Sequence, residues 1–286
     1  MNNIPHKHRI AVVSGGTSGV GKKTAMDLAK NKVEVILLGR DKARGNRVRD
    51  DIIKESGNGN VTFYPIDLSS LDEIRGFRRV LEAKYEFIDI LVSAAGVMFN
   101  ELKLTREHHD QNFVVNYLSH FWLINELIPL LKQAEQGRVL IVGALPFFIN
   151  HSKVELPTPT ATDNGTKYSG LKVVGQSLVA KVLLTVALRE QLKDTSVTVN
   201  MFHPGYVTDS NYGADSSWLA KRLGALAGLL LSKKNKPVGM ELALDPKLAK
   251  VSGQLFNEKQ QIVPLSAKYT KEKADELWAF SLNFAR

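Results

Sequence analysis

Gly15, Gly19 and Gly21 form a glycine-rich turn with a recognisable chemistry. The turn follows an apolar run that predicts a strand over 10–14 and opens a run that predicts a helix over 20–30. In this setting Gly15 permits a tight turn, Gly19 lets the backbone approach a pyrophosphate, and Gly21 lets the helix pack on the strand. The helix N-terminus adds free N–H groups and a positive dipole end. We therefore expect a dinucleotide site, with a glycine-rich helix start that binds no ligand as the alternative. Its expected residues are Gly15, Thr17, Ser18, Gly19, Val20 and Gly21.

The end of the second predicted strand indicates which dinucleotide is bound. In sites that bind NAD(H), a carboxylate at this position accepts hydrogen bonds from the ribose 2′-hydroxyl. This chain has Arg40 there instead. A guanidinium can instead pair with a 2′-phosphate through two hydrogen bonds. This favours NADP(H) over NAD(H), although Asp41 is the next residue and could take the hydroxyl.

The elements that must position these residues alternate along the chain. Nearly continuous apolar runs predict strands, as expected when helices cover both faces of a sheet. Repeated strand–helix–strand units predict an α/β fold, a Rossmann-type doubly wound parallel sheet of about seven strands flanked by helices. The strands are expected at 10–14, 33–38, 61–66, 88–94, 139–142, 197–202 and 253–256, and the helices near 20–30, 41–55, 71–85, 105–135, 166–193 and 238–251.

Length and composition bound the class of protein. The 286 residues show no linker or repeat, so we expect a single NADP-binding domain over 1–286, with substrate-side segments at 143–167 and 206–237. The net charge of +9 is scattered along the chain, which argues against a nucleic-acid partner. The chain has no cysteine, and its histidines lack metal-ligand spacing, so we predict no metal site.

We expect a cytoplasmic protein. No apolar run approaches the roughly 20 residues of a membrane span, and residues 1–9 lack the apolar core of a signal peptide. An apolar run at 223–231 followed by a basic tract at 233–236 allows weak association with a membrane surface. The interpretation that we favour is that this run roofs a substrate pocket, because Gly224 and Gly228 weaken a helical anchor.

Several further motifs resemble the short-chain dehydrogenases/reductases, and among them the retinol dehydrogenase-like branch. The resemblance covers nearly the whole chain, and it rests on the glycine turn and on the segments 66–71, 88–92, 112–121 and 203–205. It implies an oxidoreductase that forms a homo-oligomer through its two long helices. It also implies that Asp67 and Leu68 border the adenine, although Asp67 could instead cap the helix at 71. Asn116 would order a proton-relay water, and the nicotinamide amide would be covered by Pro204, Gly205, Val207 and Thr208.

The catalytic half departs from the family pattern, which makes the triad atypical or degenerate. Where the family has a serine after the fifth strand, this chain has Ala144. The family's Asn-Asn-Ala-Gly stretch reads Ser93-Ala94-Ala95-Gly96, so the asparagine that usually contacts the cofactor ribose is replaced by Ala94. Ala94, Ala95 and Gly96 are still expected to border the cofactor.

Tyr168 and Lys172 show the family's Tyr-x-x-x-Lys spacing, one helical turn apart and facing one way. In the family the tyrosine donates a proton as hydride arrives, and the lysine lowers the tyrosine pKa. Counting back from 203–205, however, places the family tyrosine at Val174 and the lysine at Leu178. A displacement of six residues is about 9 Å along a helix. Either Tyr168 and Lys172 fold back over the site from an irregular helix start, or they are a surface pair at the helix entrance.

Two functions therefore stay open. The first is an NADP(H)-dependent oxidoreductase acting on a small lipophilic alcohol or carbonyl substrate, which the apolar run at 223–231 and the pair Phe147 and Phe148 suggest. The second is a protein that binds NADP(H) but has lost the triad, and serves a cofactor-sensing, binding or non-redox role.

Overall fold

The computed structural model describes residues 8–157, 168–205 and 238–285. Within these ranges the strands form one eight-stranded sheet in the order β3-β2-β1-β4-β5-β6-β7-β8. All neighbouring pairs are parallel except β7 with β8. The strands are β1 (Ile10–Ser14), β2 (Glu34–Gly39), β3 (Val61–Pro65), β4 (Ile90–Ser93), β5 (Arg138–Val142), β6 (Thr198–Phe202), β7 (Leu255–Phe256) and β8 (Ile262–Val263). The prediction of a doubly wound parallel sheet is confirmed, and the structure adds β8 as an eighth, antiparallel edge strand.

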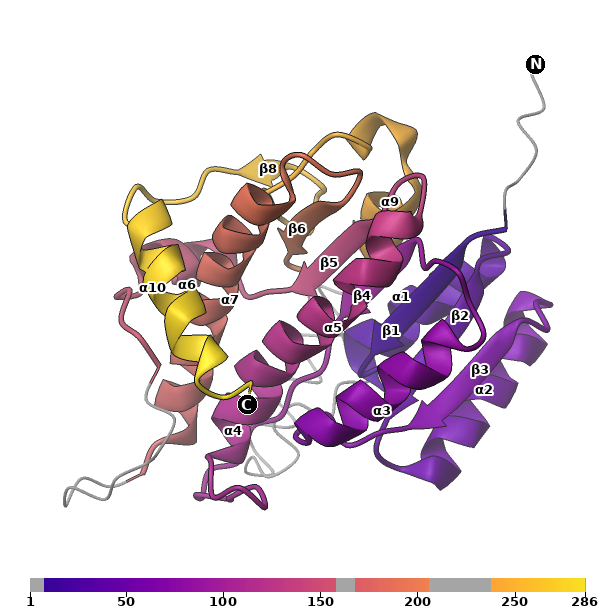
Figure 1. The fold of residues 1–286 in the computed structure, drawn as a ribbon, viewed down its shortest axis with the longest axis horizontal. Coiled ribbons are helices and arrows are strands. Elements are labelled where there is room, and N and C mark those ends of the chain that lie inside the picture. Colours follow the sequence, from indigo (N-terminus) through magenta and orange to yellow (C-terminus); the bar gives the residue numbers. More distant parts are fainter. Residues whose placement is uncertain (1–7, 158–167, 206–237, 286) are drawn as a thin grey trace.

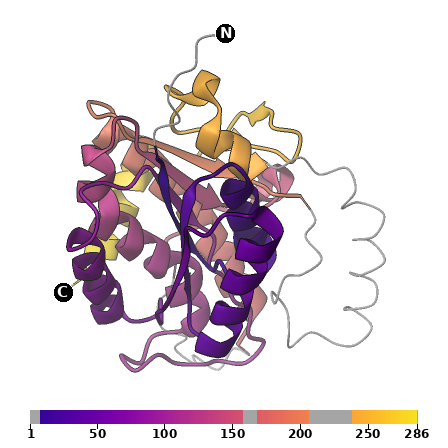
Figure 2. The ribbon, with the colours of Figure 1, turned by 90° about the vertical axis from the view of Figure 1, so that its right-hand side faces the viewer.

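Helices cover both faces of this sheet (Figures 1 and 2). Side chains of α1, α2 and α9 pack on one face, and those of α3, α5 and α7 on the other. The helical elements are α1 (Gly19–Lys30), α2 (Lys42–Ser56), α3 (Leu71–Glu82), α4 (Gln111–Phe113), the π-helical η1 (Val114–Leu118), α5 (Ser119–Gln133), α6 (Pro146–His151), α7 (Gly170–Leu192), α9 (Val238–Leu244), the 3₁₀ helix η3 (Pro246–Leu248) and α10 (Lys271–Leu282).

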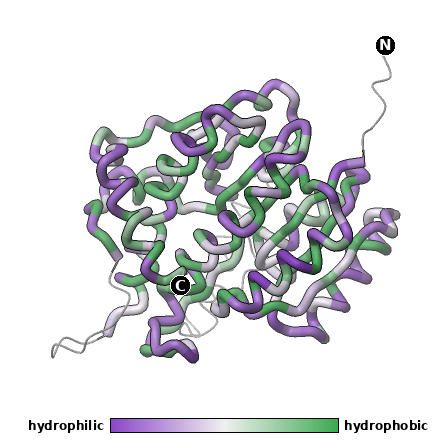
Figure 3. The backbone as a smooth tube through the Cα atoms, in the orientation of Figure 1, coloured by the Kyte–Doolittle hydropathy of each residue, from purple (hydrophilic) through white to green (hydrophobic). Residues whose placement is uncertain are grey.

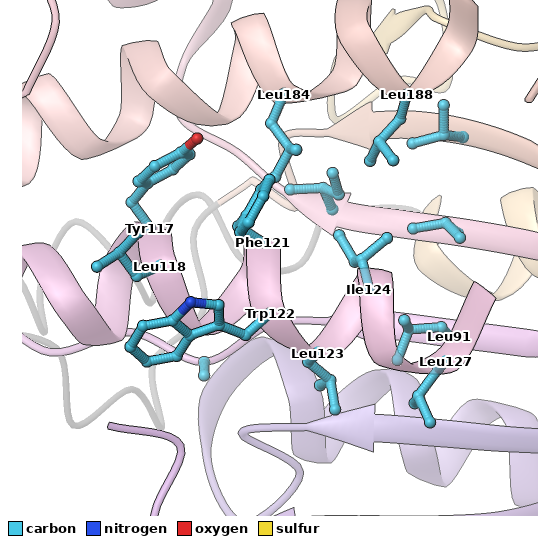
Figure 4. Close-up of a cluster of buried hydrophobic side chains, with 14 of the residues drawn as sticks. Leu91, Tyr117, Leu118, Phe121, Trp122, Leu123, Ile124, Leu127, Leu184 and Leu188 are labelled. Carbon is cyan, nitrogen blue, oxygen red and sulfur yellow. The ribbon is translucent and has the colours of Figure 1, made fainter. Parts of the chain in front are cut away.

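The hydropathy of the chain follows these layers (Figure 3). The inner strands are built mostly from apolar residues that are buried on both faces, whereas α2 turns a largely hydrophilic surface outward. Between α5 and α7, Phe121 and Ile124 face Leu184 and Leu188 (Figure 4). This contact fixes α5, which directly follows the π-helical segment with Asn116, against α7, which begins beside Tyr168.

Helix α10 lies over α5 and α7 on the side away from the sheet (Figure 1). Trp278 meets the ring of Phe121 at 4.9 Å, and Ser281 shares a 2.6 Å hydrogen bond with Tyr117. The sequence expectations omit this helix, although the buried Ala274, Leu277 and Ser281 have helical spacing.

Several predicted boundaries were wrong for local reasons. The long helix begins at Gln111 and not at 105, because His108 has a φ of +60° and Asp110 caps the helix by accepting from Asn112 N. The next long helix begins at Gly170 and not at 166. The last predicted helix, 238–251, is split into α9 and η3. The expectations also missed α6 and β8, which are too short to give a periodic pattern.

The expectation about membrane spans also needs a correction. Within the described residues, α7 is long and apolar enough to cross a membrane. Its side chains are mostly buried, however, between the sheet, α5 and α10. Its apolar character is therefore accounted for by its place in the core. The candidate surface segment 223–236 lies outside the described residues.

Candidate active site

The glycine turn lies where the strand order reverses. Strands β1 and β4 are neighbours there, and their last residues, Ser14 and Ser93, are paired in register. Open α/β sheets bind ligands at such a switch point, beyond the carboxyl ends of the strands. The fold therefore makes this edge the candidate binding site.

The backbone of the turn is as tight as the sequence predicted. Gly15 has a φ of +64°, and a Cβ there would lie 2.9 Å from Ala95 Cα. A Cβ on Gly21 would lie 2.4 Å from Gly15 O. Ser18 stands at the N-cap of α1 without making a side-chain capping hydrogen bond. The first N–H groups of α1 therefore lack the partner that a capping side chain usually gives them, which suits a phosphate.

Arg40 and Asp41 differ in how they are engaged. A Cβ on the preceding residue, Gly39, would lie 2.9 Å from Thr17 Cγ2, so Arg40 directly follows a residue that touches the glycine turn. Arg40 is exposed and makes no ion pair within the described ranges. Asp41 instead caps α2, because its Oδ1 accepts from Arg44 N at 2.9 Å. This hydrogen bond is the main cause that lowers the pKa of Asp41.

Asp67 and Leu68 follow β3 at the same edge. Asp67 Oδ1 accepts hydrogen bonds from Ser69 N at 2.9 Å and Ser69 Oγ at 2.8 Å, so it stabilises a turn. Ser70, and not Asp67, caps α3. Leu68 is buried in the core. The adenine contacts expected of Asp67 and Leu68 stay predictions.

The segment 93–97 is tied to the glycine turn on one side and to Asn116 on the other. Ser14 Oγ accepts a hydrogen bond from Ala94 N at 3.0 Å. Asn116, in the π-helical η1, accepts from Val97 N at 3.1 Å and donates to Val97 O at 2.7 Å. Its Nδ2 also donates to Asn112 O. Asn116 thus holds the loop that follows β4, and π-helical turns of this kind are frequent at functional sites.

The positions at which the family triad is expected carry no group that can transfer a proton. Ala144 follows the end of β5, Val174 is 2% exposed in the core, and Leu178 is one turn further along α7. A side chain could not easily be added one residue earlier, because a Cβ on Gly143 would lie 2.6 Å from Met201 Sδ. The fold therefore does not change the prediction that Ala144, Val174 and Leu178 stand at the family positions of the serine, the tyrosine and the lysine.

Tyr168 and Lys172 do not share a helix face, contrary to the expectation. Tyr168 lies before the N-cap residue Ser169, and Lys172 points outward from the first turn of α7. The Tyr168 hydroxyl donates to Asp110 Oδ2 at 2.9 Å and accepts from Asn112 Nδ2 at 2.8 Å. Burial, opposed by the Asn112 hydrogen bond and reinforced by Asp110, raises the pKa of Tyr168 well above its usual range.

These hydrogen bonds fasten the start of α7 to the start of α4. Asn112 also accepts from Phe99 N and donates to Phe99 O, so the same cluster holds the loop at 99. Burial raises the pKa of Asp110 as well. The family lysine lowers the pKa of its tyrosine, whereas here the surroundings of Tyr168 raise it. Sequence reasoning missed this cluster because Tyr168 lies 58 residues from Asp110.

On the far side of the site, Pro204 and Gly205 follow β6, and Gly205 has a φ of +75°. Val207 and Thr208 lie outside the described residues. His203 N donates to Phe256 O at 2.8 Å, which ties this edge to β7. Burial lowers the pKa of His203, and its Nδ1 has no partner within the described ranges.

A buried polar pair below the site was also missed. His120 and Lys181 are 0% and 4% exposed, and they lie on α5 and α7. The signal for Lys181 was in the sequence, because this lysine interrupts the otherwise apolar stretch 178–184. A lone charge on a buried stretch of helix is uncommon.

Comparison with known proteins agrees with this geometry. Residues 9–147 match the short chain dehydrogenase family. The chain is 32% identical to human retinol dehydrogenase 13, over 97% of this chain and 84% of that protein. It is 30% identical to mouse polyprenol dehydrogenase, with the same coverage of 97% and 84%. A short chain dehydrogenase from Shigella flexneri in complex with NADP has the same fold, with a TM-score of 0.66 and 18% identity over 88% of this chain and 97% of that one.

The chain belongs to the short chain dehydrogenase family, a family of oxidoreductases, and to its retinol dehydrogenase-like branch.

Proposed function

We propose that this protein binds NADP(H) and transfers hydride between its nicotinamide and a lipophilic alcohol or carbonyl compound. The cofactor assignment rests on the different interactions of Arg40 and Asp41. Arg40 lies beside the glycine turn and forms no ion pair with the residues that the structure describes, so it is able to pair with a 2′-phosphate. The Asp41 carboxylate, the alternative partner for a 2′-hydroxyl, is engaged as the cap of α2. NADP bound to the Shigella flexneri neighbour supports the same choice.

The residues present fit such a cofactor. The tight glycine turn would hold the pyrophosphate on the N-terminus of α1, and Arg40 would hold the 2′-phosphate. Asn116 fixes the loop 93–97 along the path to the nicotinamide. When bound, the cofactor would supply the hydride, so the protein must orient the substrate and provide a proton.

A lipophilic substrate is supported by the apolar surface around α6. Leu145, Phe147 and Phe148 are 56%, 74% and 41% exposed, and Leu171, at the start of α7, is 70% exposed. A Cβ on Gly175 would lie 3.4 Å from Phe148 Cζ, which places α6 against the first turns of α7. Exposed apolar side chains gathered in this way often mark a ligand-binding surface. Retinol and polyprenol, which name two relatives, are apolar alcohols.

The proton source is where this chain departs from its family. Hydride transfer to a carbonyl leaves an alkoxide oxygen that must receive a proton. Tyr168 is not free to donate to a substrate, because its hydroxyl hydrogen already bonds Asp110. We propose that Tyr168 anchors the start of α7, and that a water near Asn116, in exchange with bulk solvent, gives its proton to the alkoxide and releases hydroxide to the solvent.

A second function is favoured by one observation. Ala144, Val174 and Leu178 leave no dissociable proton at the three family positions. A chain that keeps the cofactor site and lacks these groups could serve as a cofactor-sensing or binding protein, or catalyse a non-redox step.

Two measurements separate the two functions. NADPH binding is measured by quenching of protein fluorescence, and NADPH oxidation by absorbance with a panel of lipophilic aldehydes and ketones. Turnover that persists in Tyr168→Phe supports an oxidoreductase with a water-borne proton. If turnover is lost in this variant while NADPH binding stays intact, the result supports Tyr168 as the proton donor. NADPH binding with no turnover in the wild type supports the second function.

Assembly and location are also proposals. We expect a homo-oligomer, but the surface of α5 and α7 named for it by the resemblance is covered by α10. An assembly would therefore use another face. Light scattering on the intact chain measures the oligomeric state. A dimer that dissociates when Trp278 is replaced would contradict the use of another face. The cytoplasmic location stays a prediction.

A further inference from the structure

Lys181 is a buried lysine for which no carboxylate partner is found within the described residues. Its Nζ donates a hydrogen bond to Val142 O at 2.8 Å. It belongs to none of the ion pairs formed among these residues. A charge that is removed from water without a counter-ion is costly, so such a residue calls for an explanation.

The position of Lys181 gives that explanation. Val142 is the last residue of β5, directly before Gly143 and Ala144, where the family serine would stand. Lys181 also lies three residues after Leu178, the position of the family lysine, and so on the same side of α7. The Nζ atom therefore lies at the carboxyl edge of the sheet, below the place where the catalytic groups of the family gather.

His120 connects this position to the glycine turn. Its Nε2 donates to Ala95 O at 2.9 Å, since a carbonyl can only accept, and its Nδ1 accepts from Ser93 Oγ at 2.8 Å. Ala95 is the residue that a Cβ on Gly15 would strike. Burial, and after it the charge of Lys181, lowers the pKa of His120 far below its usual range. His120 is thus neutral and cannot screen Lys181 as an anion would.

We propose that Lys181 makes this site prefer reduced over oxidised cofactor, by placing beneath the nicotinamide position a positive charge that no carboxylate among the described residues neutralises. The nicotinamide ring is cationic in NADP⁺ and neutral in NADPH. A buried cation repels the first and not the second, and low polarity strengthens the effect. The 2′-phosphate and the pyrophosphate are the same in both forms, so their attraction to Arg40 and to the N-terminus of α1 cancels from the ratio of the two affinities.

This inference rests on the proposed binding of NADP(H), and it makes the preference depend on pH. Burial lowers the pKa of Lys181 to about 7. Among the described residues, the titratable group that interacts with it is His120 on α5, which stays neutral, and β5 contributes only the Val142 carbonyl. The preference for NADPH should therefore weaken as pH rises from 6 to 8.5.

The test is a titration of NADPH and NADP⁺ into the wild type and Lys181→Met, by calorimetry at pH 6 and pH 8.5. At pH 6 the ratio of the NADP⁺ and NADPH dissociation constants should fall about tenfold in Lys181→Met, the size expected for one nearby buried charge. The wild-type ratio should fall with pH, and the ratio of the variant should not. A ratio unchanged in Lys181→Met, with both cofactors bound, overturns the proposal.

Controls keep the result specific. Lys193→Met removes an exposed lysine at the end of the same helix, and should leave the ratio unchanged. Lys181→Gln is a second neutral variant if Lys181→Met fails to fold, and a wild-type ratio independent of pH overturns the proposal without any variant. If the wild type binds neither cofactor, the proposed function itself fails, which is a different outcome from an unchanged ratio.

Discussion

Replacing Lys181 by Met should stabilise the protein, and the gain should shrink as pH rises. Burial lowers the pKa of Lys181 from 10.5 to about 7. Between these values the unfolded chain binds a proton that the folded chain does not hold, so wild-type stability increases with pH. Below pH 7 both states are protonated, and the folded state bears the full cost of the buried charge.

The magnitude follows from the two pKa values. Their difference, 10.5 minus 7, is about 3.5, and each pKa unit is about 1.4 kcal/mol, so the full effect is about 5 kcal/mol. From pH 7 to pH 9.5 the free energy of unfolding of the wild type should rise by about 3 kcal/mol relative to Lys181→Met. The lost hydrogen bond to Val142 O adds an offset of about 1 kcal/mol that is independent of pH.

Urea unfolding followed by tryptophan fluorescence measures this difference. Trp122 and Trp278 belong to the core around α5 and α10, so their emission reports the loss of that packing. Lys193→Met is the matched control, and its stability should run parallel to that of the wild type at every pH. A constant difference between wild type and Lys181→Met from pH 7 to 9.5 would refute the reasoning, because it would mean that Lys181 titrates alike in both states.

The other predictions concern the cofactor site and the start of α7. Arg40→Ala should weaken NADPH binding by about tenfold to a hundredfold and leave NADH binding nearly unchanged, because only NADPH carries the 2′-phosphate; equal losses measured by calorimetry would contradict this. Gly170→Ala should destabilise the fold by about 1–3 kcal/mol, since its Cβ would lie 1.9 Å from Phe99 O. The control Gly76→Ala, on an open helix face, should stabilise by up to about 1 kcal/mol in the same urea experiment. Tyr168→Phe should cost about 1–2 kcal/mol through its lost hydrogen bonds, and an unchanged midpoint would argue that these bonds contribute nothing.

Most of the sheet could be predicted from the sequence because its strands are local patterns. Strand β1 matches its predicted bounds, and the strands through β7 lie within about two residues of theirs, since nearly continuous apolar runs identify buried strands. The glycine turn was equally readable, because its geometry depends on residues that are neighbours in the chain. The edge strand β8 was missed because its two residues, Ile262 and Val263, carry no pattern.

The sequence by itself determined the fold class, the tight glycine turn and the absence of the family serine, tyrosine and lysine from their places. Only the tertiary structure decided what stands around those places. It paired Tyr168 with Asp110, laid α10 over the two long helices, and buried Lys181 beside a strand end without a carboxylate among the described residues. The physical reason is that turns and strands depend on neighbouring residues, whereas the partner of a hydroxyl or an ammonium depends on which distant residues packing brings within about 3 Å.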